Sequence, residues 1–321
     1  MPELPDIVVY IEALTRHVVG QRLERLTLFS PFVLRSVDPP IDAISRHPVR
    51  DVRRVGKRIV LVFDPSRASG SPRAASRGDA DLFLVLHLMI AGRLRWRAPG
   101  QKLGMGSKLI LASFEFPNGT LFFTEASSKK RASMQLVRGE TALAALNPGG
   151  IEPFDATPDQ FHDGLTRENH TLKRALTDPH LFSGIGNAYS DEILHAARLS
   201  PLKLTHSLSD QELLRLHEAT RATLLSWVDR LRAEAGDQFP EKVTAVRAGM
   251  AVHGRFKLPC PVCGSPVQRI TQGQTPSSRF KGSDPGDCNY CATCQTGGRV
   301  LADRSLSRLG VRPLRLPPSG V

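Results

Sequence analysis

Apolar residues near the start of the chain recur at the spacing of one face of a helix. These positions are Ile7, Ile11, Leu14 and Val18. Asp6 follows Pro5 and is a residue type that caps helices, and Gly20 follows the last apolar position. The pattern predicts a helix that starts next to Asp6 and ends at Gly20.

After this helix the pattern changes to short apolar runs that are typical of strands. The expected strands are Arg22–Phe29, Arg58–Phe63, Leu82–Leu88, Leu109–Phe116 and Thr120–Thr124. Pro117-Asn118-Gly119 joins the last two as a turn. One helix followed by many short strands predicts a β-sandwich domain over residues 2–145.

The second half of the chain has a helical pattern. A Pro/Gly-rich passage at 147–154 precedes it, and we expect a helical domain over 155–245. Ser209-Asp210-Gln211-Glu212 has the spacing of a capping box and predicts a long helix to about Glu234. Asp64–Asp81 is expected to be a flexible insertion, and residues 310–321 a disordered tail.

The charge balance favours a polyanionic partner. Lys and Arg number 43 against 31 acidic residues, a net charge of +12, and each cation that neutralises a phosphate releases counterions. Charge alone does not separate a nucleic-acid partner from a generally basic surface. No apolar run reaches the roughly 18 residues that span a bilayer, so we expect no membrane partner. The N-terminus has neither a basic start nor a hydrophobic signal core, and we expect a cytoplasmic protein, most simply a monomer.

All five cysteines lie between Cys260 and Cys294. This clustering indicates a local metal site in a reducing compartment rather than a disulfide framework. Two C-x-x-C pairs predict one structural Zn²⁺, in a module over 250–296, held by Cys260, Cys263, Cys291 and Cys294. Cys288 is also correctly spaced from Cys291, and its role stays open. A closed structural zinc site says nothing about function.

Four ordered stretches carry a resemblance to a known family. They are Pro2-Glu3-Leu4-Pro5-Asp6, Gly56-Lys57 before a strand, Ser183–Leu194, and the residues around the cysteine pairs (Val252-His253-Gly254-Arg255 and Tyr290–Gln295). From Pro2 to Gln295 the chain resembles the formamidopyrimidine-DNA glycosylase and endonuclease VIII family. The resemblance implies an α+β protein with a β-sandwich and a catalytic N-terminal helix, then a helix-two-turns-helix domain, then a C-terminal β-hairpin zinc finger.

The resemblance also implies a chemistry in which removal of Met1 exposes Pro2 as a secondary amine. An α-amine titrates near pH 8, so part of it is nucleophilic at neutral pH. Attack on C1′ of a deoxyribose expels the base and forms a Schiff base, which permits β,δ-elimination. Glu3 would be the acid/base partner and Lys57 a phosphate-binding cation that supports the lyase step. We therefore expect a base-excision repair enzyme that removes damaged, oxidised bases and cleaves the abasic site.

Several further residues are expected to bind DNA. Gly186 and Asn187 lie in a turn where backbone N–H groups can approach a phosphate at a helix start. His87 matches a phosphate-contacting histidine of the family more weakly, and a buried core histidine is the alternative. The remaining candidates are all cationic: Lys129, Lys130, Arg131, Arg269 and Arg279.

The match also departs from the family in the residues that replace an extruded nucleotide. The family's His-Leu-Gly-Met reads His87-Leu88-Met89-Ile90 here, and Thr124–Arg131 contains no aromatic wedge. Gly286 occupies the place of the zinc-finger arginine, and Asp6 replaces a glutamate.

These losses favour lesions that need less unstacking. One alternative is therefore an abasic-site lyase or a glycosylase for unpaired, bulky or crosslinked lesions. An alternative of another class is a non-catalytic damaged-DNA-binding protein. Retention of Pro2, Glu3 and Lys57 speaks against it.

Overall fold

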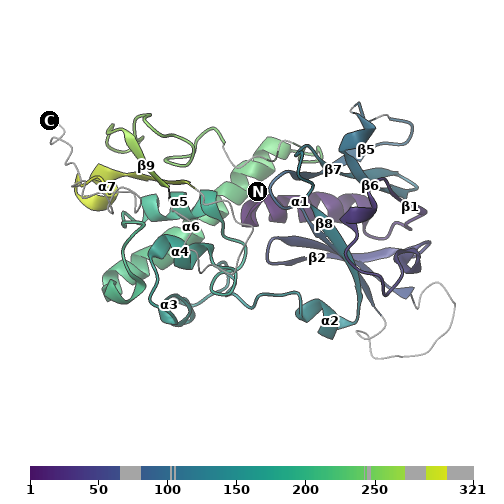
Figure 1. Ribbon diagram of the computed structural model, residues 1–321, viewed down its shortest axis with the longest axis horizontal. Helices are drawn as coiled ribbons and strands as arrows, with labels where there is room; N and C mark the ends of the chain where they lie inside the picture. The colour runs from purple at the N-terminus through teal and green to yellow at the C-terminus, as the bar shows by residue number, and fades with distance from the viewer. Residues whose placement is uncertain are drawn as a thin grey trace. The chain divides into compact units, whose positions relative to one another are not determined.

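The computed structural model describes residues 1–65, 81–101, 103–104, 106–241, 243, 247–271 and 287–301. The chain forms two compact units: Met1–Pro148 with Trp227–Thr244, and Gly149–Ser226 with Ala245–Val321. Figure 1 shows the elements of each unit. Most of the expected insertion at Asp64–Asp81 and the expected tail at 310–321 lie outside the described residues.

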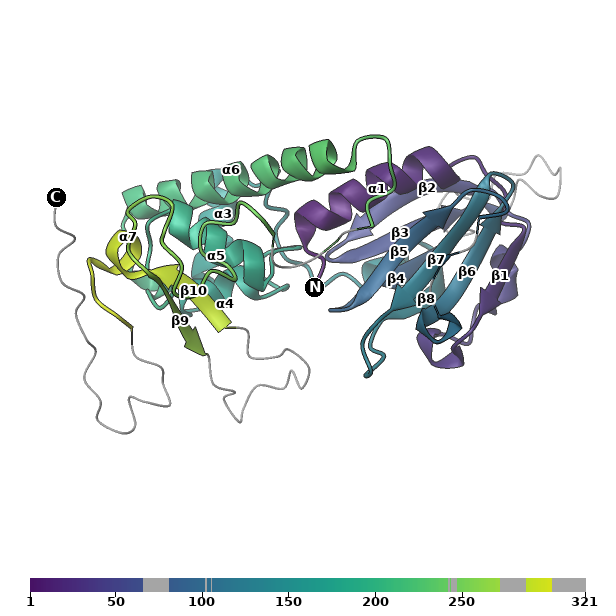
Figure 2. The same ribbon diagram turned by 90° about the horizontal axis from the view of Figure 1, so that it is seen from above.

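The first unit is a β-sandwich of two four-stranded antiparallel sheets, as predicted. One sheet has the order β1-β6-β7-β5 and the other β2-β3-β4-β8 (Figure 2). The strands are β1 (Arg25–Leu28), β2 (Val49–Val55), β3 (Arg58–Phe63), β4 (Leu82–His87), β5 (Gly92–Arg97), β6 (Ile110–Phe116), β7 (Gly119–Glu125) and β8 (Ser133–Arg138). Its α-helices are α1 (Leu4–Val18) and α2 (Glu140–Ala144), and short 3₁₀ helices lie at Pro31–Val33, Ile41–Ile44 and Ser107–Leu109.

Both faces of strand β3 are buried, which explains its continuous apolar run. Ile59, Leu61 and Phe63 face the main core, whereas Val60 and Val62 pack in a second cluster that includes Leu143 of α2. Successive side chains of a strand point to opposite faces. A strand that is buried on both faces therefore shows no alternation of apolar and polar residues. The predicted bounds of β3 are confirmed.

Helix α1 places its predicted apolar face in the main core. Ile7, Tyr10, Leu14 and Val18 are all fully buried. The helix begins at Leu4, with Glu3 as the N-cap, and not next to Asp6. Asp6 still serves the helix start, because its Oδ2 atom accepts the Glu3 N–H at 2.8 Å. The predicted position of the helix start is therefore wrong by about one turn.

Strand β1 is shorter than predicted. It begins at Arg25 rather than Arg22 because the preceding residues pair with a different segment. The Leu23 N–H donates to the His47 carbonyl at 3.0 Å, and the Arg46 N–H donates to the Leu23 carbonyl at 2.7 Å. The apolar pattern runs through the residues that pair with the His47 segment and through those that pair with β6. It therefore does not mark the residue at which the partner changes.

The second unit consists of helices and a two-stranded hairpin. Its elements are α3 (Pro158–Thr166), α4 (Leu172–Thr177), α5 (Asn187–Ala196), a 3₁₀ helix (Thr205–Ser207), most of α6 (Asp210–Ala235), β9 (Val267–Thr271), β10 (Asp287–Cys291) and α7 (Ala292–Thr296). The predicted capping box starts α6: the Glu212 carboxylate accepts the Ser209 N–H at 2.9 Å, and the Ser209 hydroxyl accepts the Glu212 N–H at 3.3 Å. The α+β fold class is confirmed.

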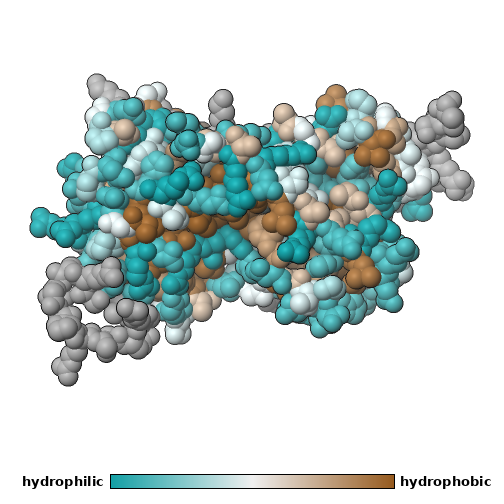
Figure 3. Space-filling model, turned by 180° about the vertical axis from the view of Figure 1, so that it is seen from behind, coloured by the Kyte–Doolittle hydropathy of each residue, from teal (hydrophilic) through white to brown (hydrophobic). Residues whose placement is uncertain are grey.

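The surface is largely hydrophilic on the face drawn in Figure 3, with hydrophobic patches between the polar side chains. Exposed apolar side chains of the first unit include Phe29, Phe32 and Val37. Scattered exposed apolar groups are normal on protein surfaces. Within the described part of the chain, no helix combines the length and the apolar character that crossing a membrane requires.

Candidate active site and nucleic-acid interface

The amino terminus of the first unit is buried at the start of α1. Pro2 is buried, and the Glu3 side chain next to it is only 2% exposed. Burial lowers the pKa of the amino-terminal amine, here on Met1, and the positive charges of Arg93 and Lys57 act in the same direction. Glu3 and Asp6 oppose this shift. A lowered amine pKa increases the neutral, nucleophilic fraction at a given pH.

Lys57 lies in the tight turn between β2 and β3. Gly56 before it has φ +59°, a left-handed conformation that glycine adopts without strain. The Gly56 carbonyl accepts a hydrogen bond from Nη1 of Arg54 at 2.8 Å. The turn therefore has a fixed shape and holds Lys57 within electrostatic reach of the amino terminus.

His87 is the last residue of β4 and lies opposite Arg58 of β3 and Ser133 of β8. Burial lowers the pKa of His87 to about 4, and the charges of Arg58 and Lys57 add to the effect. His87 is therefore neutral near pH 7. In that state its imidazole can donate an N–H to a phosphate, but it adds no positive charge.

The turn after His87 holds an apolar side chain outward. The Gly92 N–H donates to the Leu88 carbonyl at 2.8 Å, and a β-carbon on Gly92 would lie 2.3 Å from that carbonyl oxygen. Met89 has φ 52°, and Ile90 is 42% exposed. Arg93 Nη1 donates to the carbonyls of Gly92 and Ile90 at 2.7 and 3.1 Å. The turn therefore presents Ile90 at the strand end that also carries His87.

Glu125 organises the basic loop between β7 and β8. Its carboxylate is 1% exposed and accepts the backbone N–H groups of Arg131 and Ala132 at 3.0 and 3.1 Å. The Lys130 ammonium contacts the Glu125 carbonyl oxygen. Glu125 pairs with Gly92 of β5, so this loop and the Ile90 turn lie at one end of the sheet. Lys129, Lys130 and Arg131 are exposed there.

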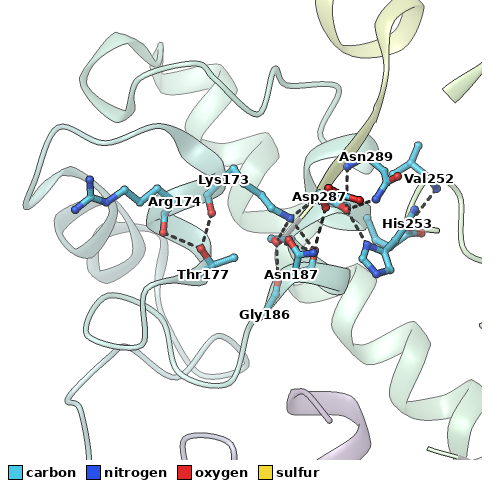
Figure 4. Close-up of polar contacts among 12 residues, drawn as sticks. Lys173, Arg174, Thr177, Gly186, Asn187, Val252, His253, Asp287 and Asn289 are labelled. Atoms are coloured by element: carbon cyan, nitrogen blue, oxygen red, sulfur yellow. Dashed lines mark hydrogen bonds and ion pairs between the residues drawn. The ribbon is translucent and has the colours of Figure 1, made fainter. Parts of the chain in front are cut away.

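In the second unit, Gly186 is the N-cap of α5 and Asn187 is its first residue. The Asn187 Nδ2 atom donates to the carbonyl of Asp287 in β10 at 3.1 Å (Figure 4). The Asn187 carbonyl accepts a hydrogen bond from the Lys173 ammonium at 2.7 Å. Asn187 therefore joins the start of α5 to the hairpin, and its amide has a second N–H hydrogen to offer a phosphate.

A buried charged network surrounds this junction. Lys173 and Asp191 form an ion pair at 2.5 Å, with side chains 3% and 0% exposed. The other carboxylate oxygen of Asp191 lies 2.8 Å from Nδ1 of His253 and accepts the Asn289 N–H at 3.1 Å. Figure 4 shows the side chains of Lys173, His253 and Asn289 in this network, with their polar contacts as dashed lines. Although burial acts to raise it, Lys173 and His253 hold the pKa of Asp191 below its ordinary value.

The next residue of α5, Glu192, binds the segment that precedes the cysteines. Its carboxylate accepts three consecutive backbone N–H groups, those of Ala251, Val252 and His253, at 2.7 to 2.9 Å. A carboxylate with several N–H donors is a strong anchor, because charge-assisted hydrogen bonds are stronger than neutral ones. Glu192 therefore fixes the entry into the cysteine module.

Four cysteines form the candidate metal centre. The Sγ atoms of Cys260, Cys263, Cys291 and Cys294 all lie within 4.8 Å of one another. The Cys263–Cys291 and Cys260–Cys294 sulfur pairs are 3.4 and 3.9 Å apart. Tetrahedral Zn²⁺ with Zn–S bonds of roughly 2.3 Å separates its sulfurs by about 3.8 Å, so the donor set fits this ion. It is the same set that the sequence predicts.

Cys288 lies outside this group. It is fully buried in an apolar cluster that includes Ile270, Tyr290 and Leu301. Burial raises the pKa of the Cys288 thiol well above its ordinary value, and the negative charge of Asp191 acts in the same direction. A neutral buried thiol behaves as a small apolar side chain. Cys288 therefore packs the hairpin.

Of the two arginines predicted to bind DNA from the zinc-finger part of the chain, the structure describes Arg269 but not Arg279. Arg269 lies on β9, where its Nη1 atom is 3.2 Å from the Asp287 carboxylate and its guanidinium is 4.6 Å above the Phe256 ring. Arg279, like Gly286, lies outside the described residues. A phosphate at Arg269 would compete with Asp287 for the same guanidinium.

The structure thus groups the predicted residues by unit. The first unit gathers Pro2, Glu3, Lys57, His87 and the basic loop; the second contains Gly186, Asn187, Arg269 and the four cysteines. Sequence reasoning missed the roles of Arg93, Glu125 and Lys173. Their partners are distant in the chain or are backbone carbonyls and N–H groups, so no local motif marks them.

Comparisons with known proteins agree with this arrangement. The model of the formamidopyrimidine-DNA glycosylase N-terminal domain matches residues 1–130, and that of the formamidopyrimidine-DNA glycosylase H2TH domain matches residues 150–234. An uncharacterised formamidopyrimidine-DNA glycosylase-like protein of Mycobacterium tuberculosis is 39% identical over 160 residues, covering 50% of this chain and 92% of the relative. A formamidopyrimidine-DNA glycosylase of Exiguobacterium sibiricum is 28% identical over 308 residues, covering 92% and 99%.

Solved structures show the same fold. The Lactococcus lactis formamidopyrimidine-DNA glycosylase bound to DNA with an oxidised pyrimidine has a TM-score of 0.73 at 20% identity, covering 92% of this chain and 100% of that one. The same enzyme with abasic-site DNA gives 0.71 at 20% identity, covering 92% and 99%. The fold is therefore that of helix-two-turns-helix DNA glycosylases. The chain belongs to the formamidopyrimidine-DNA glycosylase and endonuclease VIII family of base-excision repair proteins.

Proposed function

We propose that this protein is a bifunctional DNA glycosylase and abasic-site lyase whose nucleophile is the Pro2 amine. One observation carries the proposal: the amine at the amino terminus lies beside the buried Glu3, and its burial, together with the charges of Arg93 and Lys57, lowers its pKa although Glu3 acts to raise it. Loss of Met1 would leave the Pro2 nitrogen as the amine at this end of the chain. A neutral secondary amine there is suited to covalent catalysis.

The reaction joins the Pro2 nitrogen to C1′ and breaks four bonds: the glycosidic bond, the bond from C1′ to the ring oxygen, and the C–O bonds to the 3′ and 5′ phosphates. The Pro2 nitrogen bonds to C1′ of the damaged nucleotide, and the base departs with the electrons of its glycosidic bond. Opening of the sugar ring leaves an iminium between nitrogen and C1′, which acidifies the C2′ hydrogens. Loss of a C2′ proton expels the 3′ phosphate, and a second elimination expels the 5′ phosphate. Hydrolysis of the iminium then frees Pro2.

The side chains around the amine have separate roles in this proposal. The Glu3 carboxyl group passes a proton to the sugar ring oxygen as the ring opens, because it is attached next to the nucleophile. Lys57 and the neutral His87 hold the phosphates that flank the nucleotide. The β7–β8 loop adds the cations Lys129, Lys130 and Arg131, which Glu125 keeps in position.

DNA contacts from the second unit are assigned to Gly186, Asn187 and the hairpin, where Arg269 and Arg279 are the candidates. Lesions that are already unpaired, abasic or distorted suit this chain best. Extruding a stacked base costs a few kcal/mol, and the large apolar side chain exposed in the turn after β4 is the aliphatic Ile90 rather than an aromatic one. An abasic-site lyase without broad glycosylase activity is the second candidate, favoured by that observation.

The four cysteines are proposed to hold one structural Zn²⁺. The ion would have no open coordination position and would take no part in bond cleavage. It would fold the hairpin by joining the two C-x-x-C turns.

Borohydride trapping on abasic-site DNA tests the proposal. Reduction of the iminium should join the full-length enzyme to DNA, and peptide mass spectrometry should place the adduct on Pro2. The matched control is Pro117→Ala, which changes the β6–β7 turn and should trap normally. An adduct on Lys57, or DNA binding with no adduct, would contradict the mechanism. A panel of oxidised, crosslinked and abasic lesions in single- and double-stranded DNA then separates the two candidate activities.

A further inference from the structure

A histidine of helix α5 contacts the four-cysteine centre from outside the cysteine module. The His195 side chain is 6% exposed, and its Nε2 atom lies 3.3 Å from Sγ of Cys260, which is itself 2% exposed. His195 is not part of either C-x-x-C pair. Within the described residues, the tight sulfur group contains only the four cysteines.

The chemistry of the centre sets the direction of this hydrogen bond. Four thiolates around Zn²⁺ carry a net charge of about −2, and a metal-bound thiolate has no proton to give. The imidazole must therefore donate, which requires the tautomer with its proton on Nε2. An N–H group aimed at a thiolate withdraws electron density from sulfur and stabilises the negative charge that the buried centre retains.

His195 acts together with other residues of the same helix face. Asp191 and Glu192 precede His195 by four and three residues, the spacings at which side chains are neighbours on a helix surface. Asp191 binds His253 and Asn289, and Glu192 binds the backbone before the cysteines. The helix thus contacts the module at its entry, its hairpin and its first ligand.

The second cysteine pair has a corresponding link. The Gln295 side chain accepts the Cys291 N–H at 2.8 Å through Oε1 and donates to the Leu199 carbonyl at 2.9 Å through Nε2. Leu199 lies just after α5. Each cysteine pair is therefore connected to the helical part of the unit by one side chain: the first pair by His195 and the second by Gln295.

We propose that His195 is a positioning residue of the zinc centre: its Nε2–H donates to the Cys260 thiolate, slows zinc release and fixes the cysteine module to α5. The inference rests on the proposed zinc site. It adds a ligand-supporting group that comes from the helix-two-turns-helix part of the chain.

Zinc release from the full-length protein tests the inference. Metal analysis of the purified wild type first establishes whether one zinc is bound per chain; its absence would end the zinc proposal itself. His195→Phe should then release zinc to 4-(2-pyridylazo)resorcinol roughly 10- to 100-fold faster, if the loss of metal affinity that follows removal of a ligand's hydrogen-bond partner is expressed in the release rate. His195→Gln retains an N–H donor and should recover much of the wild-type rate.

A matched control separates this effect from general loss of packing. His217 is a part-buried histidine of the same unit whose Nε2 lies 2.9 Å from the Ala156 carbonyl, away from the cysteines. His217→Phe should release zinc at the wild-type rate. If His195→Phe does not fold, the comparison of His195→Gln with His195→Asn replaces it, because the shorter Asn amide does not reach the sulfur.

Cobalt substitution gives a spectroscopic signature that a structural role alone would not produce. Loss of the N–H donor raises the energy of the thiolate electrons, so the sulfur-to-cobalt charge-transfer band should move to longer wavelength in His195→Phe while the tetrahedral d–d bands persist. Equal zinc release in His195→Phe and His217→Phe, or an unmoved band, would overturn the inference. So would a wild-type spectrum of three sulfurs and one nitrogen, which would make His195 a ligand.

Discussion

Nδ1 of His253 lies 2.8 Å from Oδ2 of Asp191, on the carboxylate whose other oxygen binds the Lys173 ammonium. Asp191 is thus buried and charged, with a cation on one side and hydrogen-bond donors on the other. The three side chains come from α4, α5 and the segment before the first cysteine pair. This carboxylate is the point where those segments are joined.

Asp191→Leu should strongly destabilise the protein. Removing one member of a buried ion pair leaves the other charge uncompensated, which costs roughly 3–5 kcal/mol. The double variant Lys173→Met/Asp191→Leu should be less destabilised than Asp191→Leu alone. Urea unfolding measures both. Asp229→Asn, at an exposed pair with Arg232, is the control and should stay within about 0.5 kcal/mol of wild type. A double variant at least as destabilised as Asp191→Leu alone would contradict the pairing.

Glu192→Gln should loosen the entry into the cysteine module. The Gln amide presents an NH₂ group to at least one of the backbone N–H groups that the carboxylate accepts, so a buried donor loses its acceptor at about 1–3 kcal/mol. Amide hydrogen exchange at Ala251, Val252 and His253 should speed up accordingly. Exposed Glu218 on α6 supplies the control, Glu218→Gln. Unchanged protection of the three amides in Glu192→Gln would show that the carboxylate is not their anchor.

His87 should make the first unit less stable as the pH falls. Its pKa in the folded protein is about 4, below the ordinary value of roughly 6.5, so the unfolded chain binds the proton more readily. The stabilising contribution of neutral His87 is therefore complete above about pH 6.5 and is lost progressively as the pH falls from there to about 4. Unfolding free energies across that range should fall less steeply for His87→Gln than for wild type. Parallel curves would contradict the burial of a neutral imidazole.

Met89→Gly should be more stable than Met89→Ala by about 1 kcal/mol. Met89 has φ 52°, and a β-carbon makes this left-handed conformation unfavourable by about that amount. The alanine variant loses the same long side chain but retains the strain, so it is the matched control. Thermal unfolding gives the difference directly. Equal stability would mean that the turn relaxes to negative φ without the Met side chain.

Local patterns predicted the elements whose cause is local. The bounds of β3 follow from a run buried on both faces, and the start of α6 follows from the reciprocal bonds of Ser209 and Glu212. The shortened β1 was not predictable, because Leu23 pairs with the His47 segment rather than with β6. An apolar pattern reports that a strand is buried but does not identify its partner.

The residues of the candidate site likewise fall into those that a local motif predicts and those that depend on contacts between distant segments. The four cysteines group as their C-x-x-C spacing predicts, since the first pair lies on one turn and the second spans the first turn of α7. Lys173, Asp191, His253 and Asn289 come from four separate segments, and no sequence spacing connects them. The low pKa of His87 likewise depends first on its burial in the assembled sheet and then on the charge of Arg58, its neighbour across the sheet. Such relationships arise only when distant segments pack.

The first compact unit is assembled from two stretches that the helical segment 149–226 separates in the chain. Val243 belongs to the sandwich core, and the Phe239 ring lies 5.9 Å from that of Tyr10. During synthesis the sandwich strands emerge first, as N-terminal segments do, but these last core residues leave the ribosome about a hundred residues later. The core of the sandwich therefore stays incomplete until residues 227–244 have been synthesised. A recombinant fragment ending at Pro148 would lack these core residues altogether.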